Sequence, residues 1–104
     1  MTKSEIAALK KSTLQLFKGD DITSAMAKVI VIRLGNHPIN YNVVIAETRD
    51  SFSMTPASAK KLINDLIYRD VINIKTRLGE YSWNTKVQIE LTSFGQEILE
   101  EVKR

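Results

Sequence analysis

The order of structural signals between residues 55 and 95 constrains this chain more than any other feature. Thr55-Pro56 predicts a helix start, because threonine caps a first turn and proline there lacks only an N–H that the turn leaves unpaired. Aliphatic residues then recur every three or four positions as far as Ile67, which predicts a helix from Thr55 to Arg69 with one buried side. Two alternating stretches and a second helix follow, so we expect a helix, a hairpin and a helix.

The two alternating stretches predict a hairpin with a defined register. Gly79-Glu80 suits a two-residue turn with glycine first, and this turn would place Ile72 opposite Val87. One face of the hairpin would be apolar and aromatic and would include Tyr81 and Trp83, which we expect to pack on the first helix or on a second subunit. The other face would hold the polar residues Asn73, Lys75, Arg77, Ser82, Asn84 and Lys86.

Apolar spacing predicts three helices before this region and one after it. The three helices span residues 4–18, Thr23–Leu34, and Asn40 or Asn42 to Arg49. The second of them is apolar around most of its circumference, which is typical of the buried centre of a small domain. After Leu91, the capping-box spacing of Ser93 and Gln96 predicts the start of a short last helix.

The composition fits a single globular domain. The 104 residues are 43% hydrophobic and 26% charged, which is enough to bury one core, and no linker divides the chain. We therefore expect one domain over residues 1–104, with an N-terminal helix in 1–21, a core in 22–92 and a C-terminal helix in 93–104. No segment has the length and hydrophobicity that a membrane span needs.

Basic charge is concentrated in the second half of the core. The net charge is only +3, but residues 55–88 carry six basic side chains against three acidic ones. The six are Lys60, Lys61, Arg69, Lys75, Arg77 and Lys86. A surface that contacts nucleic-acid phosphates requires such a concentration of positive charge.

The pattern resembles a known family of proteins. The residues that carry the resemblance are Thr55 to Leu66, then Val71-Ile72, then Leu91-Thr92 with Gly95. From about Ile22 to Leu99 the chain resembles the winged helix-turn-helix domain of bacterial and archaeal transcriptional regulators, most nearly the MarR and PadR types. Asp70 stands where those families usually have glycine, although aspartate also tolerates left-handed backbone. The resemblance implies a mainly α fold with a small β-hairpin: a winged helix-turn-helix with additional N- and C-terminal helices.

The resemblance also implies binding of double-stranded DNA, with helix 55–69 in the major groove and wing 72–91 on the backbone or minor groove. The expected DNA-binding residues are Thr55, Ser58, Lys60, Lys61, Asn64, Lys75, Arg77 and Lys86. Lysine supplies point charges for phosphates, and asparagine can bond adenine through two hydrogen bonds. The alternative for the helix is an ordinary solvated surface, and for the wing lysines it is protection of an exposed strand.

Neither a catalytic nor a metal-binding constellation is present. The chain has no cysteine and one histidine, His37, and its adjacent acidic pairs do not converge as a catalytic dyad. We therefore expect no enzyme activity, cofactor or metal, and a cytoplasmic transcription regulator. Small regulators of the resembling type add helices for dimerisation, so the N- and C-terminal helices are the expected homodimer contact.

Two other functions fit the same sequence. A winged helix can be a protein-docking module, in which case Leu78, Tyr81 and Trp83 would form the contact patch. The chain could also coat DNA without sequence preference, as an architectural protein does. Loss of binding on neutralising Lys60 and Lys61 would favour DNA, and loss on truncating Trp83 would favour docking.

Overall fold

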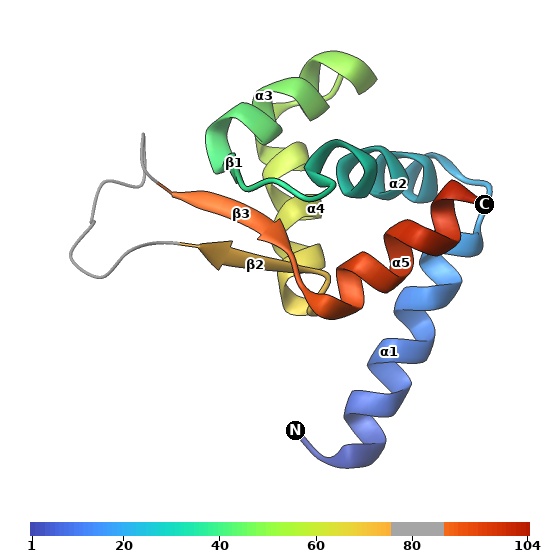
Figure 1. The fold of residues 1–104 in the computed structure, drawn as a ribbon. Helices are drawn as coiled ribbons and strands as arrows, with labels where there is room; N and C mark the ends of the chain where they lie inside the picture. The colour runs from blue at the N-terminus through green and yellow to red at the C-terminus, as the bar shows by residue number, and fades with distance from the viewer. Residues whose placement is uncertain (76–86) are drawn as a thin grey trace.

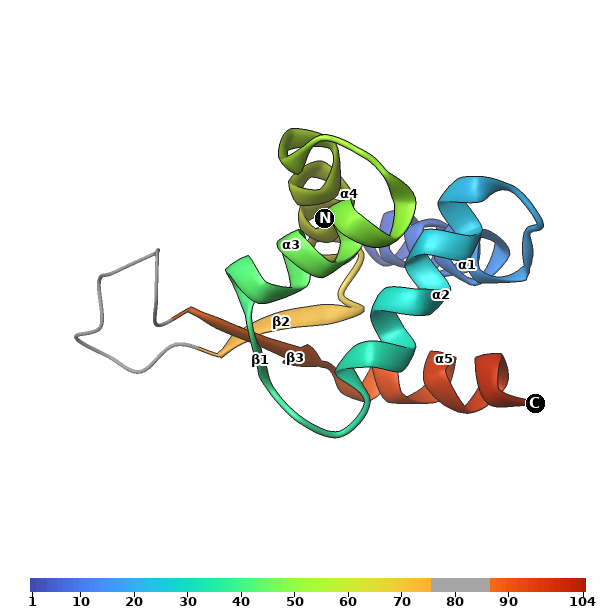
Figure 2. The ribbon, with the colours of Figure 1, turned by 90° about the horizontal axis from the view of Figure 1, so that it is seen from above.

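The computed structural model of the protein describes residues 1–75 and 87–104. This part of the chain holds five helices and a three-stranded antiparallel sheet, so the prediction of a mainly α fold with a small β element is confirmed. The helices are α1 (Lys3–Lys18), α2 (Ile22–Leu34), α3 (Tyr41–Phe52), α4 (Pro56–Tyr68) and α5 (Ser93–Lys103). The strands are β1 (Ile39–Asn40), β2 (Ile72–Lys75) and β3 (Gln88–Leu91). Strands β2 and β3 extend from the helices on the side away from the C-terminus (Figures 1 and 2).

Several helix ends lie where the sequence predicts them. The Thr55 hydroxyl accepts a hydrogen bond of 3.1 Å from the Ser58 amide and caps α4, with Pro56 in its first turn. Asn40, one of the two expected candidates, caps α3 through its side-chain oxygen. Asp70 has a φ of +62°, the left-handed backbone for which its residue type is suited. The local chemistry of these residues therefore determines where α3 and α4 begin and how the chain leaves α4.

The last helix begins at Ser93, within the expected range 93–104, but the predicted cap of α5 is wrong by one residue. Thr92, not Ser93, is the cap, and its hydroxyl accepts a 2.9 Å hydrogen bond from the Gly95 amide. The Gln96 side chain does not close a capping box. It donates instead to the backbone oxygen of Gly35, 3.0 Å away, and so links α5 to the end of α2.

The predicted hairpin register is also wrong. Ile72 lies opposite Leu91 rather than Val87, and Ile74 lies opposite Ile89. The shift is four residues, an even number, so the alternating pattern puts the same side chains on the same face in both registers. In the observed pairing Ile72 and Leu91 lie together in the core, and the Thr92 amide donates to the Val71 oxygen, which fixes the pairing at the base of the strands. The predicted turn at Gly79-Glu80 lies outside the described residues.

The sequence gives no sign of β1, which has two residues. It pairs with β3 on the side opposite β2, with Ile39 facing Ile89, so β3 is the central strand. The amide of Tyr41, the first residue of α3, then donates to the oxygen of Val87 at 2.8 Å. These contacts attach the beginning of α3 to the sheet.

Helix α2 crosses the centre of the core, as its composition predicts. Its residues Ala27, Ile30, Val31 and Leu34 are at most 1% exposed. The predicted burial around most of the circumference fails, however, for two apolar residues of α2. Val29 and Ile32 keep 43% and 52% of their surface exposed, because the neighbouring helices cover only one side of α2.

The sequence Leu91 to Gly95 closes the hairpin at its base. The Thr92 hydroxyl donates to the backbone oxygen of Asp70, and the Thr92 amide donates to that of Val71 at 3.0 Å. A Cβ atom on Gly95 would lie 2.2 Å from the Val71 oxygen, so only glycine fits there without movement of the backbone. This close approach explains physically why the resembling pattern ends in glycine.

We expect Gly95→Ala to lower the free energy of unfolding by about 1–3 kcal/mol, as overpacking of a core does. Urea unfolding followed by circular dichroism measures this change. Ser93→Ala is the control, because Ser93 is exposed in the same helix turn, and a change below about 0.5 kcal/mol is expected. Equal stability of Gly95→Ala and the wild type would contradict the packing argument.

Candidate nucleic-acid interface

Helix α4 has a buried side and a solvent-exposed side. Ala59, Leu62, Ile63 and Leu66 pack into the core with at most 8% exposure. The opposite side therefore faces solvent, since residues three and four positions apart share a helix face. The exposed residues there are Ala57, Lys60, Lys61, Asn64 and Tyr68. Three of the expected DNA-binding residues lie together on this side.

The two lysines are free of acidic neighbours in the described part of the chain. Neither Lys60 nor Lys61 has a carboxylate within ion-pair distance over residues 1–75 and 87–104. Their charges are therefore not neutralised locally by these residues. Such charges are suited to contact with an external anion.

The hydroxyls at the start of α4 bond to each other. Thr55 Oγ1 accepts from the Ser58 amide and donates to Ser58 Oγ at 3.0 Å. Thr55 thus has an established structural role as the cap, and its role in DNA contact stays a prediction. Ser58 is exposed beside it in the first turn of α4, the N-terminal end at which the helix dipole favours an anion.

Asn64 has a partner that the sequence does not reveal. The Tyr41 hydroxyl donates to Asn64 Oδ1 at 2.8 Å and so joins α3 to the exposed side of α4. Tyr41 is only 6% exposed, and burial raises the pKa of its phenol, an effect that the hydrogen bond to Asn64 opposes. The phenol is therefore protonated at neutral pH and is a hydrogen-bond donor.

A groove connects the exposed side of α4 with the sheet. Its volume is about 620 Å³, and α3, α4 and β2 form its walls. The lining includes Tyr41, Ile45, Lys60, Asn64, Ile67 and Ile74. One continuous surface thus joins the polar residues of α4 to the base of the hairpin.

The wing residues are only partly described. Lys75 is exposed, and its ammonium nitrogen lies 3.9 Å from a carboxylate oxygen of Glu90. Such an exposed pair is weak, because water and salt screen it, so Lys75 remains available to another anion. Arg77 and Lys86 lie outside the described residues, as do the aromatic residues Tyr81 and Trp83.

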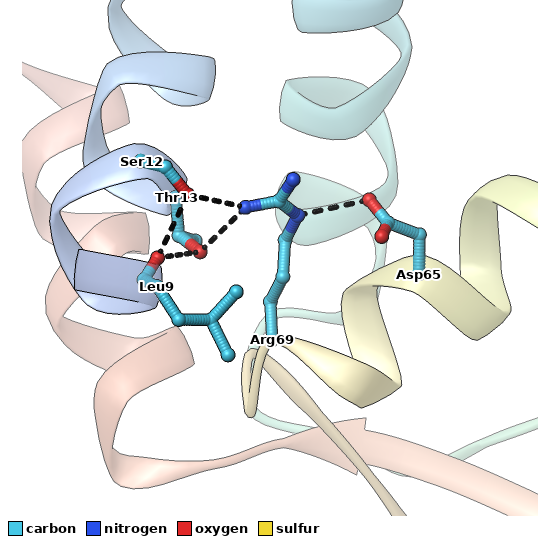
Figure 3. A network of polar contacts seen from close by, with 5 residues as sticks. All are labelled: Leu9, Ser12, Thr13, Asp65 and Arg69. Atoms are coloured by element: carbon cyan, nitrogen blue, oxygen red, sulfur yellow. Dashed lines mark hydrogen bonds and ion pairs between the residues drawn. The ribbon is translucent and has the colours of Figure 1, made fainter. Parts of the chain in front are cut away.

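Arg69 differs from the lysines of α4 because its guanidinium is bonded within the protein. Its Nε donates to Asp65 at 2.9 Å, and its Nη1 donates to the hydroxyls of Ser12 and Thr13 at 2.9 and 3.1 Å (Figure 3). Both hydroxyls in turn donate to the backbone oxygen of Leu9. Arg69 therefore joins the end of α4 to α1. Charge counting could not show this, because the contacts span more than 50 positions in the sequence.

Comparison with known proteins identifies the fold. The chain is similar to the crystal structure of Rv1404 from Mycobacterium tuberculosis, with a TM-score of 0.55 and 17% identity over 96% of this chain and 63% of that one. It is also similar to a double mutant of ZitR from Lactococcus lactis, with a TM-score of 0.53 and 14% identity over 94% of this chain and 70% of that one. No known family profile and no curated protein sequence matches the chain.

The chain has the winged-helix fold of these two structures, with α1 and α5 as helices outside the core motif. It spans 63% of the length of Rv1404. Within residues 1–75 and 87–104, no group of three or more histidine and acidic side chains could hold a metal ion. In the same residues, no helix has the length and apolar character needed to cross a membrane.

We expect Arg69→Met to lower the free energy of unfolding by about 1–3 kcal/mol, because it removes charged hydrogen bonds between two helices. Arg49→Met is the matched control, since Arg49 forms an exposed ion pair with the adjacent Asp50. Its effect is expected to stay below about 0.5 kcal/mol. Urea unfolding measures both changes, and equal losses in the two variants would show that the Arg69 contacts add nothing specific.

Proposed function

We propose that the protein is a transcriptional regulator that binds double-stranded DNA. Helix α4 would enter the major groove, and the wing, residues 72–91, would lie on the backbone or the minor groove. Regulation would follow from occupancy of a promoter or operator. Repression is the simplest result, because a protein bound over a promoter excludes the polymerase.

The exposed side of α4 is the observation that carries this proposal. It presents Lys60 and Lys61, whose charges no described carboxylate neutralises, beside the polar Asn64. The winged-helix fold supports a DNA-binding regulator in general. An α-helix fits the major groove, where phosphates lie on both sides of it and base edges lie at its floor.

Each remaining expected residue has a proposed place in this interface. Thr55 and Ser58 would bring the start of α4 to a phosphate, since the first turn of a helix attracts anions. Lys75, Arg77 and Lys86 would contact the backbone or the negative potential of the minor groove. We propose that the protein is a regulator of the MarR or PadR type, without catalytic activity and without a cofactor. We also propose that it lies in the cytoplasm, where a bacterial or archaeal regulator finds its DNA.

We further propose one domain that functions as a homodimer through α1 and α5. Helix α1 contributes little to the core: within it only Thr13 and Phe17 are buried, while Ile6 is 52% exposed and Leu14 is 36% exposed. A second subunit that covered these side chains would remove apolar surface from water. Two copies of α4 would then reach two half-sites about one helical turn apart.

DNA binding of this kind should depend strongly on salt. We expect binding of a mixed-sequence duplex, measured by fluorescence anisotropy, to weaken steeply as salt rises. For the Lys60→Ala/Lys61→Ala variant the slope of log affinity against log salt should be shallower by about two for each bound subunit, and so by about four for the proposed dimer, about one unit for each phosphate that the variant no longer neutralises.

The control for this experiment is Lys28→Gln/Arg33→Gln, which removes two charges from α2, outside α4, the wing and the proposed dimer contact, and should leave the slope close to that of the wild type. Absence of binding by the wild type at low salt would contradict the proposal and favour a docking module. Equal affinity for every duplex sequence would favour an architectural protein instead.

The proposed dimer can be tested by its mass. Light scattering should give twice the 11.8 kDa chain mass for the wild type and a monomer for Ile6→Glu. Ile32→Glu on α2 is a matched control, because Ile32 is also 52% exposed but lies outside α1 and α5, and this variant should remain dimeric. A wild-type monomer at working concentration would contradict the proposed assembly.

A further inference from the structure

We infer that Tyr41 fixes the orientation of the Asn64 carboxamide, so that Asn64 presents N–H donors to the DNA and selects a base edge with a hydrogen-bond acceptor. In this inference Asn64 determines specificity and Tyr41 is a positioning residue. It rests on the proposed function, because it names how the exposed side of α4 reads sequence. It also replaces the expectation that Asn64 bonds adenine through both its oxygen and its nitrogen, because only the nitrogen is now assigned to the base.

The position of the Tyr41 hydroxyl is set by the fold. Tyr41 is the first residue of α3, directly after the Asn40 cap, and its amide donates to the Val87 oxygen at 2.8 Å. The ring belongs to the hydrophobic core and is only 6% exposed. Backbone and ring therefore hold the hydroxyl in place at the wall of the groove, where Asn64 meets it.

The direction of the Tyr41–Asn64 bond follows from what each group can donate. A protonated phenol has one O–H to donate, and Asn64 Oδ1 is the acceptor found for it in the described part of the chain. If the carboxamide turned over, the N–H group would donate to the phenol, and the phenol O–H would lose this acceptor. Leaving a largely buried donor unpaired is unfavourable. The oxygen of Asn64 is therefore kept toward Tyr41.

A carboxamide is planar, so fixing its oxygen also fixes its nitrogen. With Oδ1 directed to Tyr41, the Nδ2 group points away from it and has no hydrogen-bond partner among residues 1–75 and 87–104. Asn64 itself is exposed and lines the groove with Lys60 and Ile74. A duplex bound across α4 would therefore meet N–H donors at this position.

The base edges of the major groove differ in what they offer to such a donor. Guanine presents N7 and O6, adenine presents N7, and thymine presents O4 as acceptors, while cytosine presents an amino donor. Asn64 should therefore donate to guanine, adenine or thymine and disfavour cytosine at one position of each half-site. A carboxylate in the same place would reverse this preference, because it can accept from the cytosine amino group.

The test is selection of bound sequences from a random duplex library, with the wild type, Asn64→Asp and Tyr41→Phe compared in parallel. Asn64→Asp has nearly the same shape and can still accept from Tyr41, but its outward atom changes from donor to acceptor. We expect cytosine to be enriched by about tenfold at one position for this variant, with the other positions unchanged. Tyr41→Phe keeps the ring and frees the amide, so the preference at that same position should become broader.

Asn36→Asp is the matched control, because it makes the same charge change at an exposed residue of the loop between α2 and β1, outside α4 and the groove, and should leave the base profile as in the wild type. Thermal unfolding of each variant verifies that it is folded. A sequence-selective wild type whose profile is unchanged in Asn64→Asp, or in Tyr41→Phe, would overturn the inference and leave DNA binding standing. A wild type that enriches no sequence would refute both the inference and a sequence-specific regulator.

Discussion

The burial of one side of α4 is the constraint on which the rest of the interface depends. Ala59, Leu62, Ile63 and Leu66 are held in the core at no more than 8% exposure, and rotation of the helix about its axis would bring some of them into water. Two polar contacts restrict α4 further. The Tyr41 hydroxyl bonds to Asn64 in the middle of α4, and Arg69 joins the C-terminal end of α4 to α1. The exposed side of α4 is thus held in one orientation, which the proposed reading of a base edge would need.

Local chemistry explains why much of this fold could be predicted from the sequence. Helix periodicity and side-chain caps act over three or four residues, so the start of α4 at Thr55 and the left-handed Asp70 are visible in the sequence itself. The hairpin register could not be predicted in this way, because alternation repeats every two residues and cannot detect a shift of four. The pairing of Ile72 with Leu91 is fixed instead by hydrogen bonds from Thr92 to the backbone of Asp70 and Val71, contacts that periodicity does not contain.

The candidate site was less predictable, for a related reason. Residue types on the exposed side of α4 could be predicted, because they depend on the helix period alone. Their partners could not, because Tyr41 and Asn64 are 23 positions apart, and Arg69 reaches Ser12 across 57 positions. In the sequence, a basic residue that bonds to another part of the protein looks the same as one whose charge is available to a phosphate. Only the three-dimensional structure separates Arg69, which is engaged by α1, from the lysines of α4.

The two strands of the hairpin are closed at their base by contacts of Thr92 and Gly95, and this closure determines which substitutions the hairpin can tolerate. Thr92 bonds the end of β3 and the start of α5 to the backbone of Asp70 and Val71, and Gly95 packs closely against the Val71 oxygen. None of these contacts involves the segment between the two strands, so substitutions in that segment leave these contacts as they are. Selection can therefore act on the segment between the strands separately from the closure at their base.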